Sequence, residues 1–330
     1  MIYEMEGTVI EQYRLAGPFS RPPTGELSLD RQTLKQLMRR SDLIPLARLV
    51  ACVVIIGSLG MLYYRSIGSW WVVPALLVFA STLSLTIYSL SHECSHGTPF
   101  RSRRLNETVF WATSLIFGQE LLYRRYSHAA HHTYTMFVGE DAQLPFTQPV
   151  SLRNYLLWYS GVLYHTQFLQ VLVLHSLRRF SKRTLNFTPP EELPRMARNS
   201  RLFLCAYGAA ALVSWYLGST LLLWMWLLPK LIGDPVMLAY AASQHFEMEE
   251  NTEDLRRSTR SLRPNWLIDL FYWNMSYHVE HHLYPTVPFF ALPTLSELLQ
   301  EQLPRPKGIF STTRDILVAC ATRSKRLKHS

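Results

Sequence analysis

The stretch SIGSWWVVPALLVFASTLSLTIYSLSHECSH, residues 66–96, decides the fold class. Its part from Ser66 to Leu90 carries no formal charge, and the two histidines of HECSH follow almost directly. An apolar run of about 20 residues is long enough to cross a bilayer as a helix. The stretch therefore predicts a transmembrane helix that ends at the membrane surface in a pair of histidines.

The rest of the chain predicts three more helices of this kind. With 48% hydrophobic and 17% charged residues, the sequence is more apolar than that of an ordinary soluble protein. Other uncharged runs cover 49–64, which extends back to Ile44 across Arg48, and 202–229, which continues through 231–243. We expect an all-α integral membrane protein with two helical hairpins, whose spans lie at about 44–64, 70–91, 202–218 and 220–243. Lys230 and Asp234 are four residues apart and are expected to pair on one helix face.

Basic residues beside these runs predict the orientation. They precede the first span, follow the second and precede the third, at Lys35, Arg39, Arg40, Arg48, Arg101, Arg103, Arg104, Arg178, Arg179, Lys182, Arg183, Arg195, Arg198 and Arg201. By the positive-inside rule these segments are cytoplasmic, so the net charge of +9 indicates a membrane surface and not a nucleic-acid partner. The start of the chain, with Glu4 and Glu6, lacks the pattern of a signal peptide. We expect both termini in the cytoplasm, most plausibly at a bacterial inner membrane.

This topology divides the chain into three parts. Residues 1–43 form a cytoplasmic N-terminal segment with a short charged helix at about 31–40, residues 44–300 form the membrane domain with cytoplasmic loops 93–201 and 244–300, and residues 301–330 form a cytoplasmic tail. The uncharged segment 155–177 is expected to lie in the interface, because a span there would place the basic residues that follow it outside. The four cysteines form no CxxC pair, which indicates packing residues in a reducing compartment.

Nine of the twelve histidines fall in four short groups at the predicted cytoplasmic ends of the spans. The groups are HECSH at 92–96, HAAHH at 128–132, the single His245, and HVEHH at 278–282. Residues at i, i+3 and i+4 share one face of a helix, so each box presents its imidazoles together. Composition alone predicts roughly 0.02 matches to HxxHH, which makes two chance matches very improbable. We therefore predict metal ligands at His92, His96, His128, His131, His132, His245, His278, His281 and His282.

The number of imidazoles favours two metal ions. A zinc site takes about four ligands, fewer than are present here, whereas imidazole also suits iron. Two irons can activate O2 for attack on an aliphatic carbon-hydrogen bond, which is the chemistry that an apolar membrane substrate requires. Polar residues near the boxes are candidates to orient the rings: Glu93, Glu120, Glu140, Asp141, Asn274 and Glu280. His165, His175 and His329 are expected to have ordinary structural roles.

The three boxes resemble those of the membrane fatty acid desaturase and hydroxylase superfamily. The segment from Gln244 to Pro293, with a Gln-His pair before the third box and a proline-rich segment after it, is similar to bacterial desaturase-like proteins. The resemblance covers about residues 44–300. It implies four spanning helices, a cytoplasmic helical cap that holds two iron ions, O2 as co-substrate and the nine histidines as ligands.

The resemblance leaves the reaction open among several outcomes on an acyl or lipid chain. Desaturation is expected first, and fatty acid decarboxylation to a terminal alkene, hydroxylation and ketone formation are the alternatives. The sequence has no haem, ferredoxin or nucleotide-binding signature, so we expect a separate electron donor of the ferredoxin or rubredoxin type with its reductase.

Two rival functions follow from the same motifs. HECSH also satisfies the HExxH pattern of zinc proteases, with Glu93 as general base, but the other two boxes would then be coincidence. A metal-binding transporter or sensor of the same architecture would need histidines along a path through the bilayer, whereas these lie at one end of the spans.

Overall fold

The computed structural model describes residues 27, 29–148 and 150–326. Within these ranges every regular element is helical, and the extended backbone pairs only in an isolated bridge between Leu262 and Lys307. The expected all-α class is therefore confirmed for the described part. Most of the N-terminal segment, and His329, lie outside it.

The first predicted hairpin is present. A short helix α2 (Arg31–Leu37) leads into α3 (Leu43–Ser66) and α4 (Val72–His96), which run antiparallel and are each long and apolar enough to cross a membrane. Asp42 precedes α3 and its carboxylate accepts a hydrogen bond from the amide of Ser102. Helix α4 ends at Gly97, whose φ of +67° is unstrained only for glycine.

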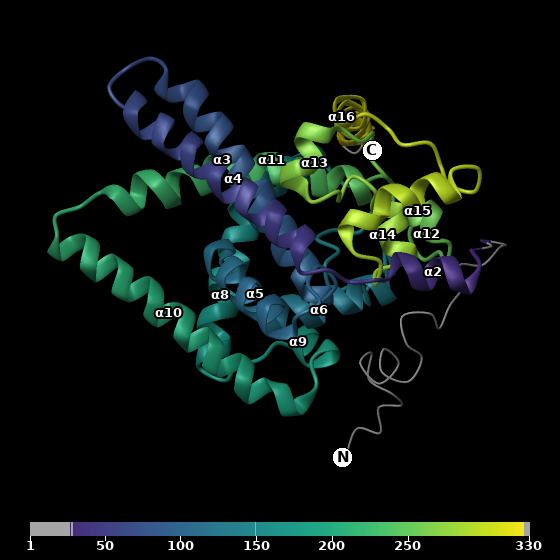
Figure 1. The fold of residues 1–330 in the computed structure, drawn as a ribbon, viewed down its shortest axis with the longest axis horizontal. Helices are drawn as coiled ribbons and strands as arrows, with labels where there is room; N and C mark the ends of the chain where they lie inside the picture. The colour runs from purple at the N-terminus through teal and green to yellow at the C-terminus, as the bar shows by residue number, and fades with distance from the viewer. Residues whose placement is uncertain (1–26, 28, 149, 327–330) are drawn as a thin grey trace.

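The second hairpin consists of α10 (Leu193–Tyr216), a π-helical turn η3 (Leu223–Leu227) and α11 (Leu228–His245). The chain turns at Gly218, where the predicted spans 202–218 and 220–243 meet, but α10 begins well before residue 202. Hydropathy marked only the apolar part of this helix, whereas the helix itself includes the arginine-bearing segment. Figure 1 shows the turns of both hairpins on one side of the molecule and α12, α14 and α15 on the other.

The segment between the hairpins contains α5 (Arg103–Phe117), α6 (Leu121–Thr133), α7 (Leu152–Tyr159), α8 (Val162–Ser176), α9 (Lys182–Phe187) and the 3-10 turn η2 (Pro190–Glu192). Gly161, with φ of +77°, separates α7 from α8, so 155–177 is not one continuous helix. The 15 residues of α8 extend about 22 Å, less than the hydrocarbon thickness of about 30 Å. This length agrees with the expectation that the segment does not span.

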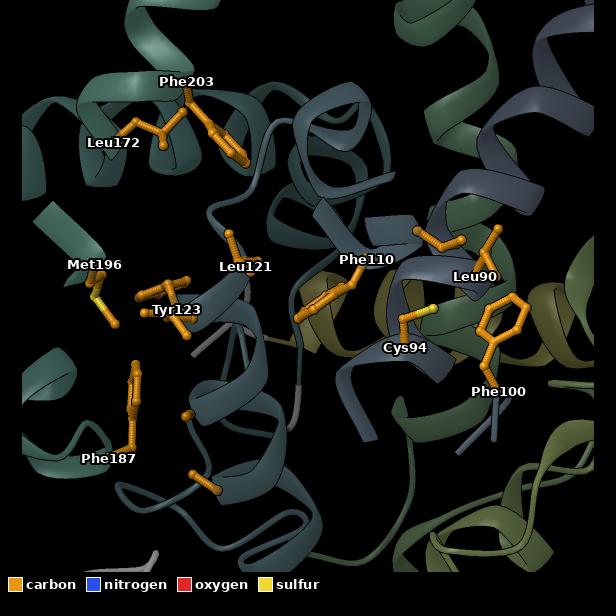
Figure 2. Packing of buried hydrophobic residues seen from close by; sticks show 14 of the residues in the cluster. Leu90, Cys94, Phe100, Phe110, Leu121, Tyr123, Leu172, Phe187, Met196 and Phe203 are labelled. Carbon is orange, nitrogen blue, oxygen red and sulfur yellow. The ribbon is translucent and has the colours of Figure 1, made fainter. Parts of the chain in front are cut away.

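The C-terminal part contains several short helices and a longer last one: α12 (Leu255–Ser258), α13 (Trp266–Tyr272), α14 (His278–Leu283), the 3-10 turn η4 (Phe289–Ala291), α15 (Leu292–Leu299) and the 18-residue α16 (Ile309–Arg326). A buried apolar cluster ties the end of α4 to α5, α6, α9 and α10. Figure 2 shows Tyr123 of α6 beside Phe187 and Met196, and Phe110 of α5 beside Cys94. This packing fixes α6 against α4, which brings the first two histidine boxes together.

Candidate metal centre

Four helices carry the nine predicted histidines. His92 and His96 lie in the last turn of α4, the second box lies on α6, and the third box makes up most of α14. His245 is the last residue of α11. Glu120 fixes the start of α6, because its side chain accepts a hydrogen bond from the amide of Tyr123.

The nine imidazoles converge. One group contains His92, His96, His128, His132 and His281, and a second contains His131, His245 and His282; in each group one nitrogen per residue lies within 4.8 Å of all the others. His278 adjoins the second group, with its Nε2 2.8 Å from that of His245 and 3.1 Å from that of His282. The structure thus brings together every histidine that the sequence singled out as a ligand.

The spacing of the nitrogens fits metal ligands. The Nε2 atom of His92 lies 2.8 Å from that of His281 and 3.2 Å from that of His128. Two ligands about 2.1 Å from one metal, at right angles, are separated by about 3 Å. The Nε2 atom of His96 is buried and has no hydrogen-bond partner within the described residues, although it faces the other rings. A metal ion in each group would bind such nitrogens.

The rings have the protonation state that ligands need. Burial, followed by the proximity of other histidines, holds the pKa of His128, His132, His278, His281 and His282 well below its ordinary value. These imidazoles are therefore neutral at physiological pH, and neutral imidazole is the metal-binding form.

Polar side chains orient the rings from behind. The Asp141 carboxylate accepts a hydrogen bond from the Nδ1 of His131, 3.0 Å away, and further hydrogen bonds from the amides of Met136 and Gln143. Burial alone would raise the pKa of Asp141, but His131 and these amides outweigh it and keep that pKa below the usual value. Asp141 is thus a carboxylate, which fixes the His131 tautomer with its Nε2 toward the cluster.

Two residues that the sequence did not single out have similar positions. The Oε1 atom of Gln143 lies 3.1 Å from the Nδ1 of His128, and the hydroxyl of Thr135 lies 3.1 Å from the Nδ1 of His282. Neither could be found from residue type, because glutamine and threonine carry no charge signal.

Of the six polar residues that were predicted to orient the histidine rings, only two lie beside the rings. Besides Asp141, Glu93 approaches the cluster, with one carboxylate oxygen 3.9 Å from the Nδ1 of His281 and the other bonded to the amide of Phe289. Three of the others form hydrogen bonds away from the histidines: Glu120 with Asn199, Glu280 with Ser261 and Ser296, and Asn274 with Arg48 and the carbonyl of Phe289. Glu140 is exposed.

The histidines that were expected to be structural do lie outside the cluster where the structure describes them. The Nε2 atom of His165 is 3.3 Å from Asp234, and His175 is buried beside Thr184. The predicted pair is confirmed, since Lys230 Nζ lies 2.7 Å from the Asp234 carboxylate.

Comparison with known proteins assigns the chain to a family. The family model for fatty acid desaturases matches residues 26–313, which is most of the sequence. The chain belongs to the fatty acid desaturase family. The resemblance of its three histidine boxes is thereby confirmed, and the protease reading of HECSH has no support.

Three relatives show how widely this desaturase family varies. The chain is 25% identical to a Delta(5) fatty acid desaturase of Caenorhabditis elegans over 64% of this chain and 54% of that protein. It is 24% identical to an sn-1 acyl-lipid omega-3 desaturase (ferredoxin) of Synechocystis over 71% of this chain and 69% of that protein. It is 26% identical to a sphingolipid delta(4)-desaturase/C4-monooxygenase of Rattus norvegicus over 67% of this chain and 62% of that protein. The match thus spans little more than half of the Caenorhabditis protein.

Two cavities reach the histidines of this desaturase-family chain. A cavity of about 490 Å³ borders His92, His128, His131, His245 and His278. Apolar side chains of α7, α8 and α11 line part of the rest, together with polar side chains such as those of Gln119, Gln167 and Gln244. A second, of about 410 Å³, borders His96 and His128 and has Arg40, Arg103 and Arg125 around it. The cluster is thus accessible from one mainly apolar and one basic cavity.

Proposed function

We propose that this protein is a membrane-bound di-iron enzyme that uses O2 and external electrons to desaturate a fatty acyl chain. The observation that carries the proposal is the convergence of nine imidazoles, in two groups, beside an apolar cavity. Membership of the fatty acid desaturase family supports the same chemistry.

The proposed ligands are the nine converging histidines. His92, His96, His128, His132 and His281 would hold one iron, and His131, His245, His282 and His278 would hold the other. Iron bound there would supply the activation of O2 that attack on an aliphatic carbon-hydrogen bond requires. The chain itself holds the rings neutral by burying them, and it fixes three of them through Asp141, Gln143 and Thr135.

The proposed topology has four spans and a cytoplasmic cap, in a bacterial inner membrane with both termini in the cytoplasm. Helices α3 and α4 have the length and apolarity of spans. Helices α10 and α11 form a second hairpin whose turn lies on the same side as the first (Figure 1). Trp215, Tyr216 and Leu217 at this turn are highly exposed, as expected for residues in contact with lipid or its interface. In this topology residues 44–300 form the membrane domain, 155–177 lies in the interface and 301–330 is a cytoplasmic tail.

The proposed electron donor is a separate ferredoxin or rubredoxin type protein with its reductase. Support comes from the basic cavity at His96 and His128, where arginines would attract an acidic partner. The printed name of the Synechocystis relative also includes ferredoxin.

The proposal is tested by expressing the chain with iron in a bacterial host and comparing extracted lipids and volatiles by mass spectrometry. We expect new double bonds with the wild-type protein, their loss in His281→Ala, and their retention in the control His165→Gln. Hydroxylated chains or terminal alkenes would contradict desaturation while retaining oxidation, and identical lipids in all three strains would contradict the proposal.

A further inference from the structure

The larger cavity has one buried arginine in its lining, which also includes many apolar side chains, several amides and the Asp141 carboxylate that bonds His131. Its apolar lining residues include Trp158, Phe168, Met237, Leu238 and Phe246. The volume of about 490 Å³ is that of a small-molecule site. It suits one extended apolar chain better than a whole phospholipid or a nucleotide carrier.

The buried arginine is Arg124. This residue lines the cavity, is 4% exposed, and lies on α6 one turn before His128, so the two side chains share one helix face. Its Nη1 donates to Gln119 Oε1 at 2.9 Å and its Nη2 donates to the carbonyl of Tyr88 at 3.2 Å. Its Nε is buried and has no hydrogen-bond partner within the part of the chain that the structure describes. Among the described residues no carboxylate pairs with Arg124.

A buried guanidinium without an anion is costly. The rings of Tyr88 and Phe117, 5.1 and 4.8 Å from the guanidinium carbon, offset only part of that cost. An arginine cannot lose its proton to escape the penalty. A carboxylate that entered the cavity would neutralise the charge and accept at two points from the two Nη groups, each of which has a second hydrogen beyond the one it donates to Gln119 or to Tyr88.

We propose that Arg124 binds the carboxylate of an unesterified fatty acid, whose tail extends between α7, α8 and α11. The claim that the bound acid is oxidised rests on the proposed function, whereas the claim that Arg124 binds it does not. Methyl esters and thioesters lack the negative charge. A phosphate monoester, with nearly two negative charges, would lack a second cation beside Arg124. Because Arg124 is one turn from His128, the carbons that face the histidines are those near the carboxyl end.

Arg183 offers the rival arrangement. It also borders the cavity, but it is exposed and donates to the carbonyls of Asp141 and Leu144. If Arg183 bound the headgroup of the substrate, Arg124 would lie beside the methylene groups of the acyl chain. Oxidation would then occur at carbons further from the headgroup. Arg183→Gln is therefore the matched control for Arg124→Gln.

The test measures binding to the full-length protein without turnover. An ω-brominated fatty acid, its methyl ester and the alkyl phosphate of the same length are titrated at about pH 8, where the acid is ionised. Quenching of Trp158 is obtained as the difference from a Trp158→Phe variant. We expect the acid to bind at least about tenfold more tightly than the ester and the phosphate, as a charge-assisted hydrogen bond provides. This preference should disappear in Arg124→Gln and persist in Arg183→Gln.

Equal binding of acid and ester by the wild-type protein would overturn the inference, as would tighter binding of the phosphate. Loss of the preference in Arg183→Gln alone would also overturn it. If Arg124→Gln does not fold, Arg124→Lys keeps the charge without the two-point geometry, and its acid preference should fall severalfold. Failure of the proposed oxidation would appear separately, as unchanged lipids together with intact acid binding.

Discussion

At Gly233 the backbone of α11 packs directly against the backbone of α4, and replacing this glycine tests how the fold positions the histidine cluster. A Cβ atom at residue 233 would overlap the carbonyl group of Ala80 and would lie 2.6 Å from the Ser84 hydroxyl oxygen. The carbonyl belongs to the backbone of α4 and cannot rotate away, so the two helices must separate. Overpacking of this kind costs about 1–3 kcal/mol.

The displacement should reach the histidines. Helix α4 ends in His92 and His96, and α11 ends in His245, so separation of the helices pulls ligands of the two groups apart. Gly233→Ala is expected to lower the melting temperature in detergent by roughly 4 °C, because a cost near 3 kcal/mol is divided by the unfolding entropy of a 330-residue chain, about 2.1 cal/mol/K per residue. It should also lower the bound iron. The matched control is Gly208→Ala, where a Cβ meets nothing within 4 Å. An unchanged melting temperature and iron content in Gly233→Ala would refute the reasoning.

The remaining predictions concern charges. Asp141→Asn should weaken iron binding about 10–100-fold, measured by competition with a chelator, whereas Glu140→Gln at the exposed neighbour should not; equal affinities would contradict the orienting role. Burial raises the pKa of Glu120 to about 7. The folded protein therefore binds this proton more tightly than the unfolded chain does. As the pH rises from about 4.5 through 7, the free energy of unfolding should fall by about 3 kcal/mol. Glu120→Gln should therefore flatten the fall in melting temperature over this range, and an equally steep fall would contradict the assignment. Lys230→Met leaves the Asp234 carboxylate buried without its ammonium partner and should cost about 3–5 kcal/mol, with partial recovery when Asp234→Asn is added.

The sequence was sufficient to predict which histidines converge, because the histidine spacing encodes helix faces. HxxHH places three imidazoles on one side of a helix wherever that helix lies, so their convergence required only that α4, α6, α11 and α14 meet. The spacing does not predict which histidines of a box belong to which of the two groups. His128 and His132 belong to one group and His131 to the other, because neighbouring helices approach α6 from different directions.

Other features depended on tertiary packing that local patterns do not encode. The start of α10 at Leu193 was missed because hydropathy reports burial in lipid and not helix formation. Gln143 and Thr135 contact histidines only because of how the chain after α6 folds back. The sequence does not distinguish Arg124 from the other basic residues, because only the structure shows that it is buried beside the cavity.

The most direct test of the central claim is the iron content of the purified full-length protein. Protein produced with iron should contain about two irons per chain, which is the number that two histidine groups imply. His281→Ala should lose iron from the first group and His282→Ala from the second, while His175→Gln, outside both groups, should retain the wild-type content. Zinc in place of iron, or an iron content that none of these substitutions changes, would contradict the account.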